Sequence, residues 1–294
     1  MQYGFSIKRK CYLLSVLLMT VWLTGCVQEE FESTPSPAGN GIRFTLTVPD
    51  VNLPSVSSRT MTGTGTAKKE DEIETVDILV FDMSKTPAVF LEWVSATGVT
   101  QDLADNSTVS FSAVLSPTTA STCIVVVANK ELDNIVSGFT KGATTKVEAM
   151  EKMLHTQTGK WLADGSTTGG YTRIPMYGEK VISKITPSMD PITGINMKRM
   201  LARIDIRNNS ATSNFTVEEV YLANYNTTGY IAPAWNTNGQ VTDPAPDTPV
   251  LPVNSGKMTE EGDAILYSVN GNTPYEGEIY TFESIAAEDV GGVG

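Results

Sequence analysis

The chain has 294 residues, of which 21 are basic and 33 acidic, so its formal net charge at neutral pH is −12. A negative surface repels nucleic acid, and composition therefore argues against a DNA- or RNA-binding protein. Because 40% of the residues are hydrophobic, the chain can build the core of one or two globular domains.

The first 25 residues have the layout of an export signal. Three basic residues at 8–10 precede an apolar run over 12–23, which is too short for a membrane-spanning helix because a span needs about 20 apolar residues. The run ends in "LTGC", which resembles the lipobox of bacterial lipoproteins, where the cysteine is acylated and the chain is cut before it. We expect residues 1–25 to be a lipoprotein signal peptide and Cys26 to be lipidated. The alternative is an ordinary signal peptide with an incidental cysteine.

Residues 26–40 predict a flexible tether, because they are rich in Ser, Pro and acidic residues. The acidic start of this segment is similar to the tract that directs lipoproteins to the cell surface in Bacteroidetes-type bacteria. The alternative is a solvated acidic tether, which would have the same composition. Without residues 1–25 the chain would carry 18 basic and 33 acidic residues, a net charge of −15. We expect an outer-membrane, lipid-anchored precursor at the cell surface.

Residues 41–49, "GIRFTLTVP", alternate apolar and polar side chains. This period of two predicts a half-buried strand, and its buried face consists of Ile42, Phe44, Leu46 and Val48. The next segment, 50–72, has no apolar periodicity and predicts a long exposed loop that is either functional or disordered.

Further strands are predicted along the rest of the chain. Nearly continuous β-branched runs at 74–82 and 122–130 are typical of strands covered on both faces. Apolar residues at helical spacing predict a helix over 144–156. The remaining expected strands lie at 108–116, 179–186, 197–208, 215–225 and 277–284.

The strand expected at 197–208 has alternating apolar and charged side chains. We expect Met200, Ala202, Ile204 and Ile206 to face the core, and Arg199, Arg203, Asp205 and Arg207 to form a charged solvent face. The pattern changes after this strand, and we place a domain boundary near Asn208. The predicted domains are therefore residues 41–207 and 208–294.

Catalytic and metal chemistry finds little support in the residue types present. With Cys11 in the signal and Cys26 acylated, Cys123 would be the remaining cysteine, and its apolar neighbours favour a core position over a reactive thiol. His155 is the single histidine, and we interpret it as a solvated side chain at the end of a helix. The acidic run 70–72 is interpreted as a solvated loop. We therefore predict no enzyme activity, no metal site and no cofactor.

The order of these features resembles the fimbrilins, the major fimbrial subunits of the type V pili of Bacteroidales. The resemblance covers residues 13 to about 230. It runs from the lipobox through "GIRFTLTVP", a linker with an arginine ("SVSSRTM"), "VDILVFD", "CIVVVANK" and a short helix to "LARIDIRN". It implies a mainly β fold of two consecutive β-sandwich-like (transthyretin-like) domains with one or two short helices.

The resemblance also implies a mechanism. In fimbrilins an arginine-specific protease cuts the linker after the first strand, and a strand from a neighbouring subunit fills the emptied groove. On this sequence the cut would fall between Arg59 and Thr60 and would release the strand at 41–49. The implied partners are other fimbrial subunits, the outer membrane through the lipid and an arginine-specific protease. The implied function is that of a structural subunit of an adhesive fimbrium.

Two alternatives remain open at this point. Fimbrilins carry further strands after the position of "EIYTFES", including the donor strand, so residues 208–294 predict either a truncated chain or a subunit that receives a donor without supplying one. A surface glycan-binding lipoprotein would share the lipobox and the β domains, and would stack sugars on exposed aromatic residues. Its candidates are Trp161, Tyr171, Tyr177, Tyr225, Tyr230 and Trp235.

Overall fold

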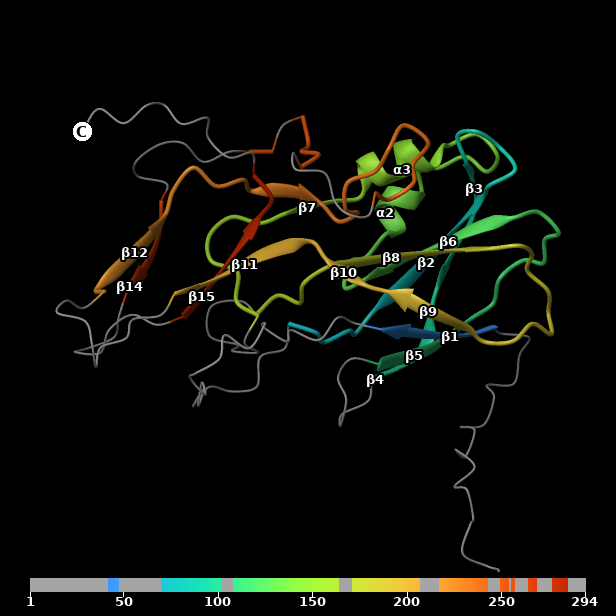
Figure 1. The fold of residues 1–294 in the computed structure, drawn as a ribbon, viewed down its shortest axis with the longest axis horizontal. Coiled ribbons are helices and arrows are strands. Elements are labelled where there is room, and N and C mark those ends of the chain that lie inside the picture. Colours follow the sequence, from blue (N-terminus) through green and yellow to red (C-terminus); the bar gives the residue numbers. More distant parts are fainter. Residues whose placement is uncertain are drawn as a thin grey trace, which may run out of the picture. The chain divides into compact units, whose positions relative to one another are not determined.

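The structure is a computed structural model, and it describes residues 42–47, 70–101, 108–163, 171–206, 217–242, 249–253, 255–256, 264–268 and 277–284. These residues form several β sheets and two short helices (Figure 1), which confirms the predicted mainly β, sandwich-like fold. Asn208 lies outside the described residues, so the domain boundary near it stays a prediction.

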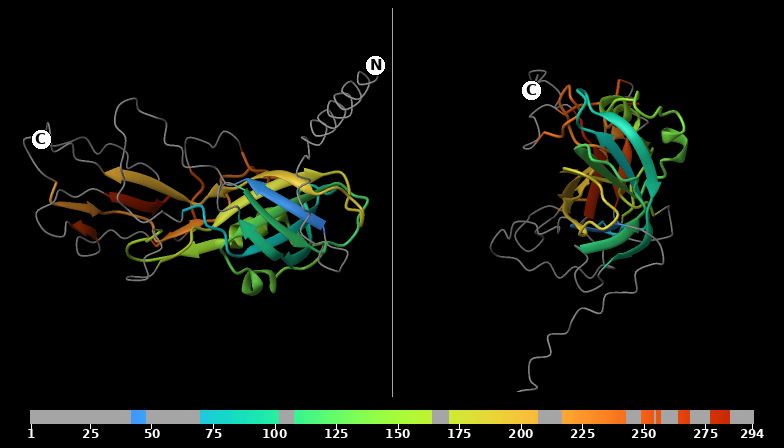
Figure 2. Two further views of the ribbon diagram at one scale, coloured as in Figure 1. Left: turned by 90° about the horizontal axis from the view of Figure 1, so that it is seen from below. Right: turned by 90° about the vertical axis from the view of Figure 1, so that its right-hand side faces the viewer.

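The first sheet contains the strand that the sequence predicts at 41–49. It has four strands in the order β4-β5-β1-β9, and Figure 2 shows β1 among them in blue. The four strands are β1 (Ile42–Thr47), β4 (Thr97–Gln101), β5 (Thr108–Ala113) and β9 (Ile192–Asn196). β1 runs antiparallel to β5 and parallel to β9. It is therefore an interior strand with a neighbour on each side.

The second sheet is antiparallel and has five strands in the order β10-β8-β6-β2-β3. They are β2 (Val76–Asp82), β3 (Val89–Ser95), β6 (Thr122–Ala128), β8 (Met176–Ile182) and β10 (Lys198–Arg199). Every residue of β6 is buried, and so is all of β2 except its last residue. The prediction that these two runs are covered on both faces is confirmed.

Two hydrophobic cores lie against the opposite faces of the second sheet. Ile78 and Ile124 belong to the core shared with β1 and β5, whereas Leu79 and Val125 belong to a core shared with residues of helix α3. Successive side chains of a strand point to opposite faces, so each central strand feeds both cores. Residues after 208 add to the second core through Ile231, Tyr280 and Phe282.

The helices are α2 (Asp133–Val136) and α3 (Lys146–Lys152). α3 begins with a capping box, in which the Thr145 side chain accepts from the Glu148 amide and the Glu148 carboxylate accepts from the Thr145 amide. The helix ends at Lys152, two residues before Leu154, which begins strand β7 (Leu154–Thr156). The helix expected over 144–156 is therefore shorter than its apolar spacing suggested.

The remaining strands form three two-stranded ribbons. They are β7 with β13 (Thr228–Tyr230), β11 (Leu201–Ile206) with β15 (Gly277–Phe282), and β12 (Glu219–Leu222) with β14 (Ile265–Ser268). The strands predicted at 197–208, 215–225 and 277–284 are thus present in shorter form.

The predicted facing of residues 197–208 holds for Met200, which is buried, and for Ile206, which packs against a small core, but it is wrong over residues 202–204. Arg207 lies outside the described residues. Met200 interrupts the strand between β10 and β11 and is itself buried, so the alternation changes phase at this point. Ala202 and Ile204 are exposed, whereas Arg203 is only 19% exposed and forms an ion pair. A one-residue irregularity is enough to exchange the two faces of a strand.

His155 is also placed differently from the prediction. It lies on β7, and its ring packs 5.1 Å from the ring of Trp161 and 6.4 Å from that of Phe282. Its Nδ1 is buried and has no hydrogen-bond partner among the described residues. Burial, with a smaller effect of Lys130, lowers the pKa of His155 to about 4. The interpretation as a solvated side chain is therefore wrong.

Cys123 is fully buried in β6, as predicted, and burial raises its pKa to about 12. The thiol therefore stays protonated and unreactive near neutral pH.

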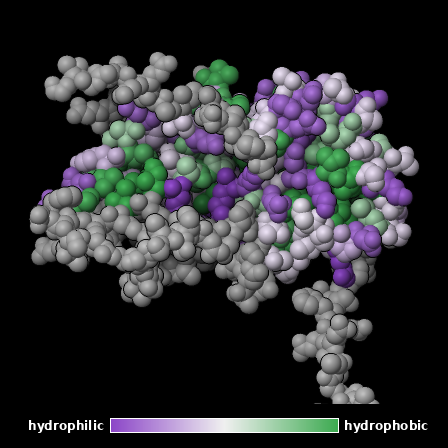
Figure 3. All heavy atoms as spheres, viewed as in Figure 1, coloured by the Kyte–Doolittle hydropathy of each residue, from purple (hydrophilic) through white to green (hydrophobic). Residues whose placement is uncertain are grey.

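On the face shown in Figure 3, hydrophobic residues lie interspersed with hydrophilic ones. Among the described residues, neither helix has the length and apolar character needed to cross a membrane.

Candidate strand-exchange site

β1 occupies a slot between β5 and β9. Its apolar residues face apolar residues of β5 in register, with Phe44 opposite Phe111 and Leu46 opposite Val109. On its other side, Phe44 pairs with Ile192 of β9. If β1 were absent, both neighbours would present unpaired backbone edges, which readily accept another strand.

The apolar side chains of β1 are almost fully buried. Ile42, Phe44 and Leu46 are 4%, 1% and 0% exposed, and the rings of Phe44 and Phe111 stack at 5.0 Å with an interplanar angle of 7°. Each such side chain contributes about 1.5–3 kcal/mol on burial. An empty slot would therefore expose a row of apolar pockets at alternate positions.

The chain connection makes β1 separable. β1 is the first described strand, and residues 48–75 join it to β2. One cut between residues 47 and 70 would leave β1 attached to the fold through hydrogen bonds and packing alone. Among the described strands, a single cut can separate only the first, β1, or the last, β15, from all the others.

Several predicted site residues lie outside the described residues. Cys26, Val48, Arg59 and Thr60 belong to this group, so the lipidation site and the cleavage site stay predictions. The burial of Ile42, Phe44 and Leu46 agrees with the alternation from which we predicted it. Their exchange for another strand is a proposal.

Glu70 is a site residue that sequence reasoning missed. The acidic run 70–72 was expected to be solvated, but Glu70 is only 4% exposed. Its carboxylate accepts from Arg203 at 2.7 Å and from the Tyr280 hydroxyl. The partners lie far away in the sequence, so no local pattern signals the burial of this carboxylate.

Comparison with known families decides the identity. The model of the family described as major fimbrial subunit protein (FimA) matches residues 42–203, more than half of the chain. This chain belongs to the FimA family. The match begins at the first residue of β1 and ends within β11, and it confirms the resemblance that the order of sequence motifs indicated.

Three solved structures that resemble this FimA family member come from Parabacteroides distasonis and Bacteroides thetaiotaomicron. A fimbrial assembly protein of Parabacteroides distasonis ATCC 8503 is 13% identical, with a TM-score of 0.38 over 81% of this chain and 85% of that one. A candidate cell adhesion protein of the same organism is 18% identical, with a TM-score of 0.45 over 85% and 73%. A candidate polysaccharide-binding protein of Bacteroides thetaiotaomicron VPI-5482 is 12% identical, with a TM-score of 0.37 over 83% and 72%. Comparison with curated protein sequences finds no match.

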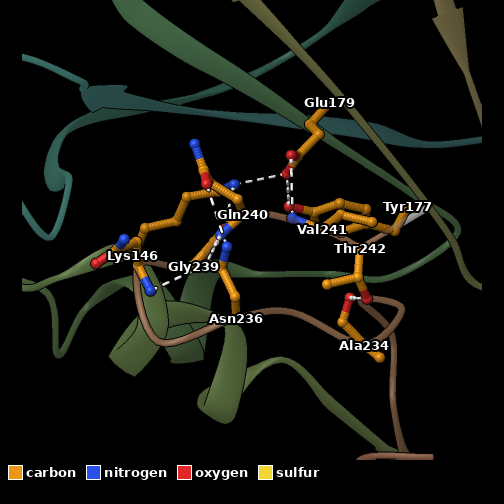
Figure 4. Close-up of polar contacts among 10 residues, drawn as sticks. Lys146, Tyr177, Glu179, Ala234, Asn236, Gly239, Gln240, Val241 and Thr242 are labelled. Atoms are coloured by element: carbon orange, nitrogen blue, oxygen red, sulfur yellow. Dashed lines mark hydrogen bonds and ion pairs between the residues drawn. The ribbon is translucent and has the colours of Figure 1, made fainter. Parts of the chain in front are cut away.

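A second polar cluster in this FimA family member contains residue types that enzymes use. Figure 4 shows Lys146, which is 1% exposed, donating to the Glu179 carboxylate at 2.6 Å and to the Gly239 carbonyl at 2.6 Å. The Tyr177 hydroxyl donates to the same carboxylate at 2.5 Å. Burial raises the pKa of Tyr177 well above its usual value. The cluster joins α3, β8 and the segment around Gly239, so we interpret it as a structural link.

Metal chemistry and sugar stacking also find little support in the geometry. No group of three or more His, Cys, Asp or Glu within the described residues is placed to hold a metal ion. Of the six aromatic candidates for sugar binding, three are buried in the core and the other three are half-buried. Tyr230 and Trp235 pack edge to face on each other at 4.9 Å. Fully exposed stacking platforms are thus not found among these six.

Proposed function

We propose that the protein is a structural subunit of an adhesive cell-surface fimbrium that assembles by strand exchange at β1. It is exported as a lipoprotein acylated on Cys26 and held at the outer membrane. An arginine-specific protease then cuts between Arg59 and Thr60. After the cut, β1 leaves its slot, and a strand of a neighbouring subunit enters by β-augmentation.

One observation carries this proposal. β1 is an interior strand, so its removal opens two backbone edges and an apolar row at once, and yet it is joined to the rest of the fold by one linker. An interior strand of the second sheet, such as β6, is instead joined to the rest of the chain at both ends. The combination makes β1 a replaceable part of the core.

Cleavage after an arginine suits the linker chemistry. The segment "LPSVSSRTMTGTG" is rich in Pro, Ser and Gly, and exposed segments of small and polar residues are the usual sites of proteolytic cutting. The guanidinium offers a planar fork of donors that an acidic pocket can bind bidentately. Arg43 is a poor competitor because it lies within β1, paired with Ser112 of β5.

A disulfide that locks β1 in place tests the exchange step separately from the cut. Thr45 and Ser110 are Cα partners across β1 and β5, and antiparallel partners lie about 4.5–5.5 Å apart, within disulfide range. We expect the Thr45→Cys/Ser110→Cys protein to be cut after Arg59 but to stay monomeric until a reductant is added. The single variant Thr45→Cys is the control and should assemble normally. Assembly of the oxidised double variant would contradict the proposal.

A further inference from the structure

Side chains, and not strand pairing, fix residues 70–74, which lie at the downstream end of the predicted linker. Residues 70–75 precede β2 and lie in no helix or strand, and yet Ile73 is only 5% exposed. Gln101, at the end of β4, donates to the Asp71 carbonyl at 2.8 Å and accepts from the Ile73 amide at 3.1 Å. One side-chain amide thus supplies both bonds that a neighbouring strand would otherwise make.

A second amide repeats this arrangement one residue further on. Asn129 follows β6 with a left-handed φ of 58°, a conformation that asparagine tolerates better than most residues. It donates to the Glu72 carbonyl at 2.7 Å and accepts from the Glu74 amide at 3.0 Å. The Arg173 guanidinium forms ion pairs with the carboxylates of the same two residues, at 3.1 Å from Glu72 and 2.7 Å from Glu74.

Glu70 fixes the start of the same segment. Its carboxylate, 5% exposed, is bound by Arg203 of β11 and Tyr280 of β15, which are themselves paired across the ribbon. The Arg199 Nε of β10 donates to the Glu70 carbonyl at 3.0 Å. A buried carboxylate with charged and hydroxyl donors is held firmly, because losing a partner would leave an uncompensated charge.

We propose that residues 70–74 form an anchor that holds the downstream end of the linker when β1 is cut away, with Glu70 as its main positioning residue. The inference rests on the proposed function, because it assigns a role to these residues in the cut protein. The partners named above lie on β4, β10, β11 and β15, just after β6 and just before β8, so none of them leaves with β1. Cleavage then releases β1 without loosening the entry into β2, and the slot keeps its walls for the incoming strand.

Hydrogen exchange on the full chain tests the anchor. The amides of Ile73 and Glu74 are followed before and after cutting with an arginine-specific protease, in the wild type and in Glu70→Gln. In the wild type we expect the exchange rate of these two amides to change by less than about twofold on cutting. In Glu70→Gln we expect their exchange rate to be at least about tenfold higher than in the wild type, both before and after cutting. The matched control is Glu92→Gln, because the Glu92 carboxylate also accepts two bonds, from the amide and hydroxyl of Ser116 at 2.7 and 2.6 Å.

The outcomes separate the anchor from the proposed function. Loss of protection in the cut wild type, or equal exchange in Glu70→Gln and Glu92→Gln, would overturn the anchor. If the wild type were not cut after Arg59, the processing step would fail, and the comparison of the uncut variants would still decide whether Glu70 holds the segment. Should Glu70→Gln fail to fold, Tyr280→Phe removes one donor to the same carboxylate and should raise exchange in the same direction.

Discussion

His155 shows how one half-buried titratable side chain can contribute to the response of this protein to acid. Its ring lies against Trp161 and Phe282 at the junction of β7 and β15, and burial lowers its pKa to about 4. An unfolded histidine has a pKa of about 6.5. Between these two values the unfolded chain binds a proton that the folded chain excludes, so the free energy of unfolding falls as the pH is lowered from about 6.5 to 4.

We expect His155→Phe to remove this part of the acid sensitivity. The substitution keeps an aromatic ring in the cluster and deletes the titrating group. Thermal unfolding midpoints of wild type and variant, measured from pH 7 to pH 4, should diverge in favour of the variant as the pH falls. A difference that is constant over this range would show that His155 is protonated in the folded protein as readily as in the unfolded one.

Individual residues were the hardest features to predict from sequence. Cys123 was placed correctly, because its apolar neighbours on both sides leave no solvent-facing position. Glu70, Arg203 and His155 were misplaced, because partners remote in the sequence bury Glu70 and partly bury Arg203 and His155. Local composition describes a charged residue's neighbours along the chain, whereas its burial depends on the neighbours that the fold supplies.

Among the elements of the fold, β1 couples the sequence pattern to the proposed function most directly. Its alternation places Ile42, Phe44 and Leu46 inside, while Thr47 at its end is exposed. Phe44→Asp would put a carboxylate against Phe111 at a cost of several kcal/mol. We expect the thermal midpoint of the uncut protein to drop strongly.

The control for this substitution is Thr47→Asp, which places the same charge at the exposed end of the same strand. It should leave the midpoint nearly unchanged, since exposed substitutions usually stay within about 0.5 kcal/mol. Equal midpoints for the two variants would mean that the Phe44 face of β1 does not contribute to the core, and the slot would lose its physical basis.

The strands with strong apolar patterns were predictable, and those built around glycine were not. β2 and β6 stand out as β-branched runs, but β4 and β9 contain Gly98 and Gly194 at φ of 64° and 70°. Glycine inside a run normally weakens the prediction of a strand. The parallel pairing of β1 with β9 joins segments far apart in the chain, which no local periodicity can reveal. The sequence therefore predicted strand β1 itself, whereas the neighbours that form its slot could be identified only from the structure.

At the scale of the whole molecule, the proposed function makes this chain a precursor whose N-terminal part is expected to serve export and then to be removed. Cys26 is expected to carry acyl chains, and stable anchoring takes more than one such chain. Metabolic labelling with palmitate should therefore label the wild type and not Cys26→Ala. Equal labelling of the two would contradict the lipoprotein assignment, and a Cys26→Ser control should behave as Cys26→Ala does.

The N-terminus of the assembled subunit tests the central proposal most directly. Fimbriae sheared from the surface of the native bacterium would be dissociated, and the first residues of this subunit read by N-terminal sequencing. Cleavage and exchange predict a chain that begins at Thr60, with residues 26–59 absent and with no such product from an Arg59→Ala strain. A subunit in the polymer that begins at the lipidated Cys26, or normal assembly of Arg59→Ala, would contradict the strand-exchange account.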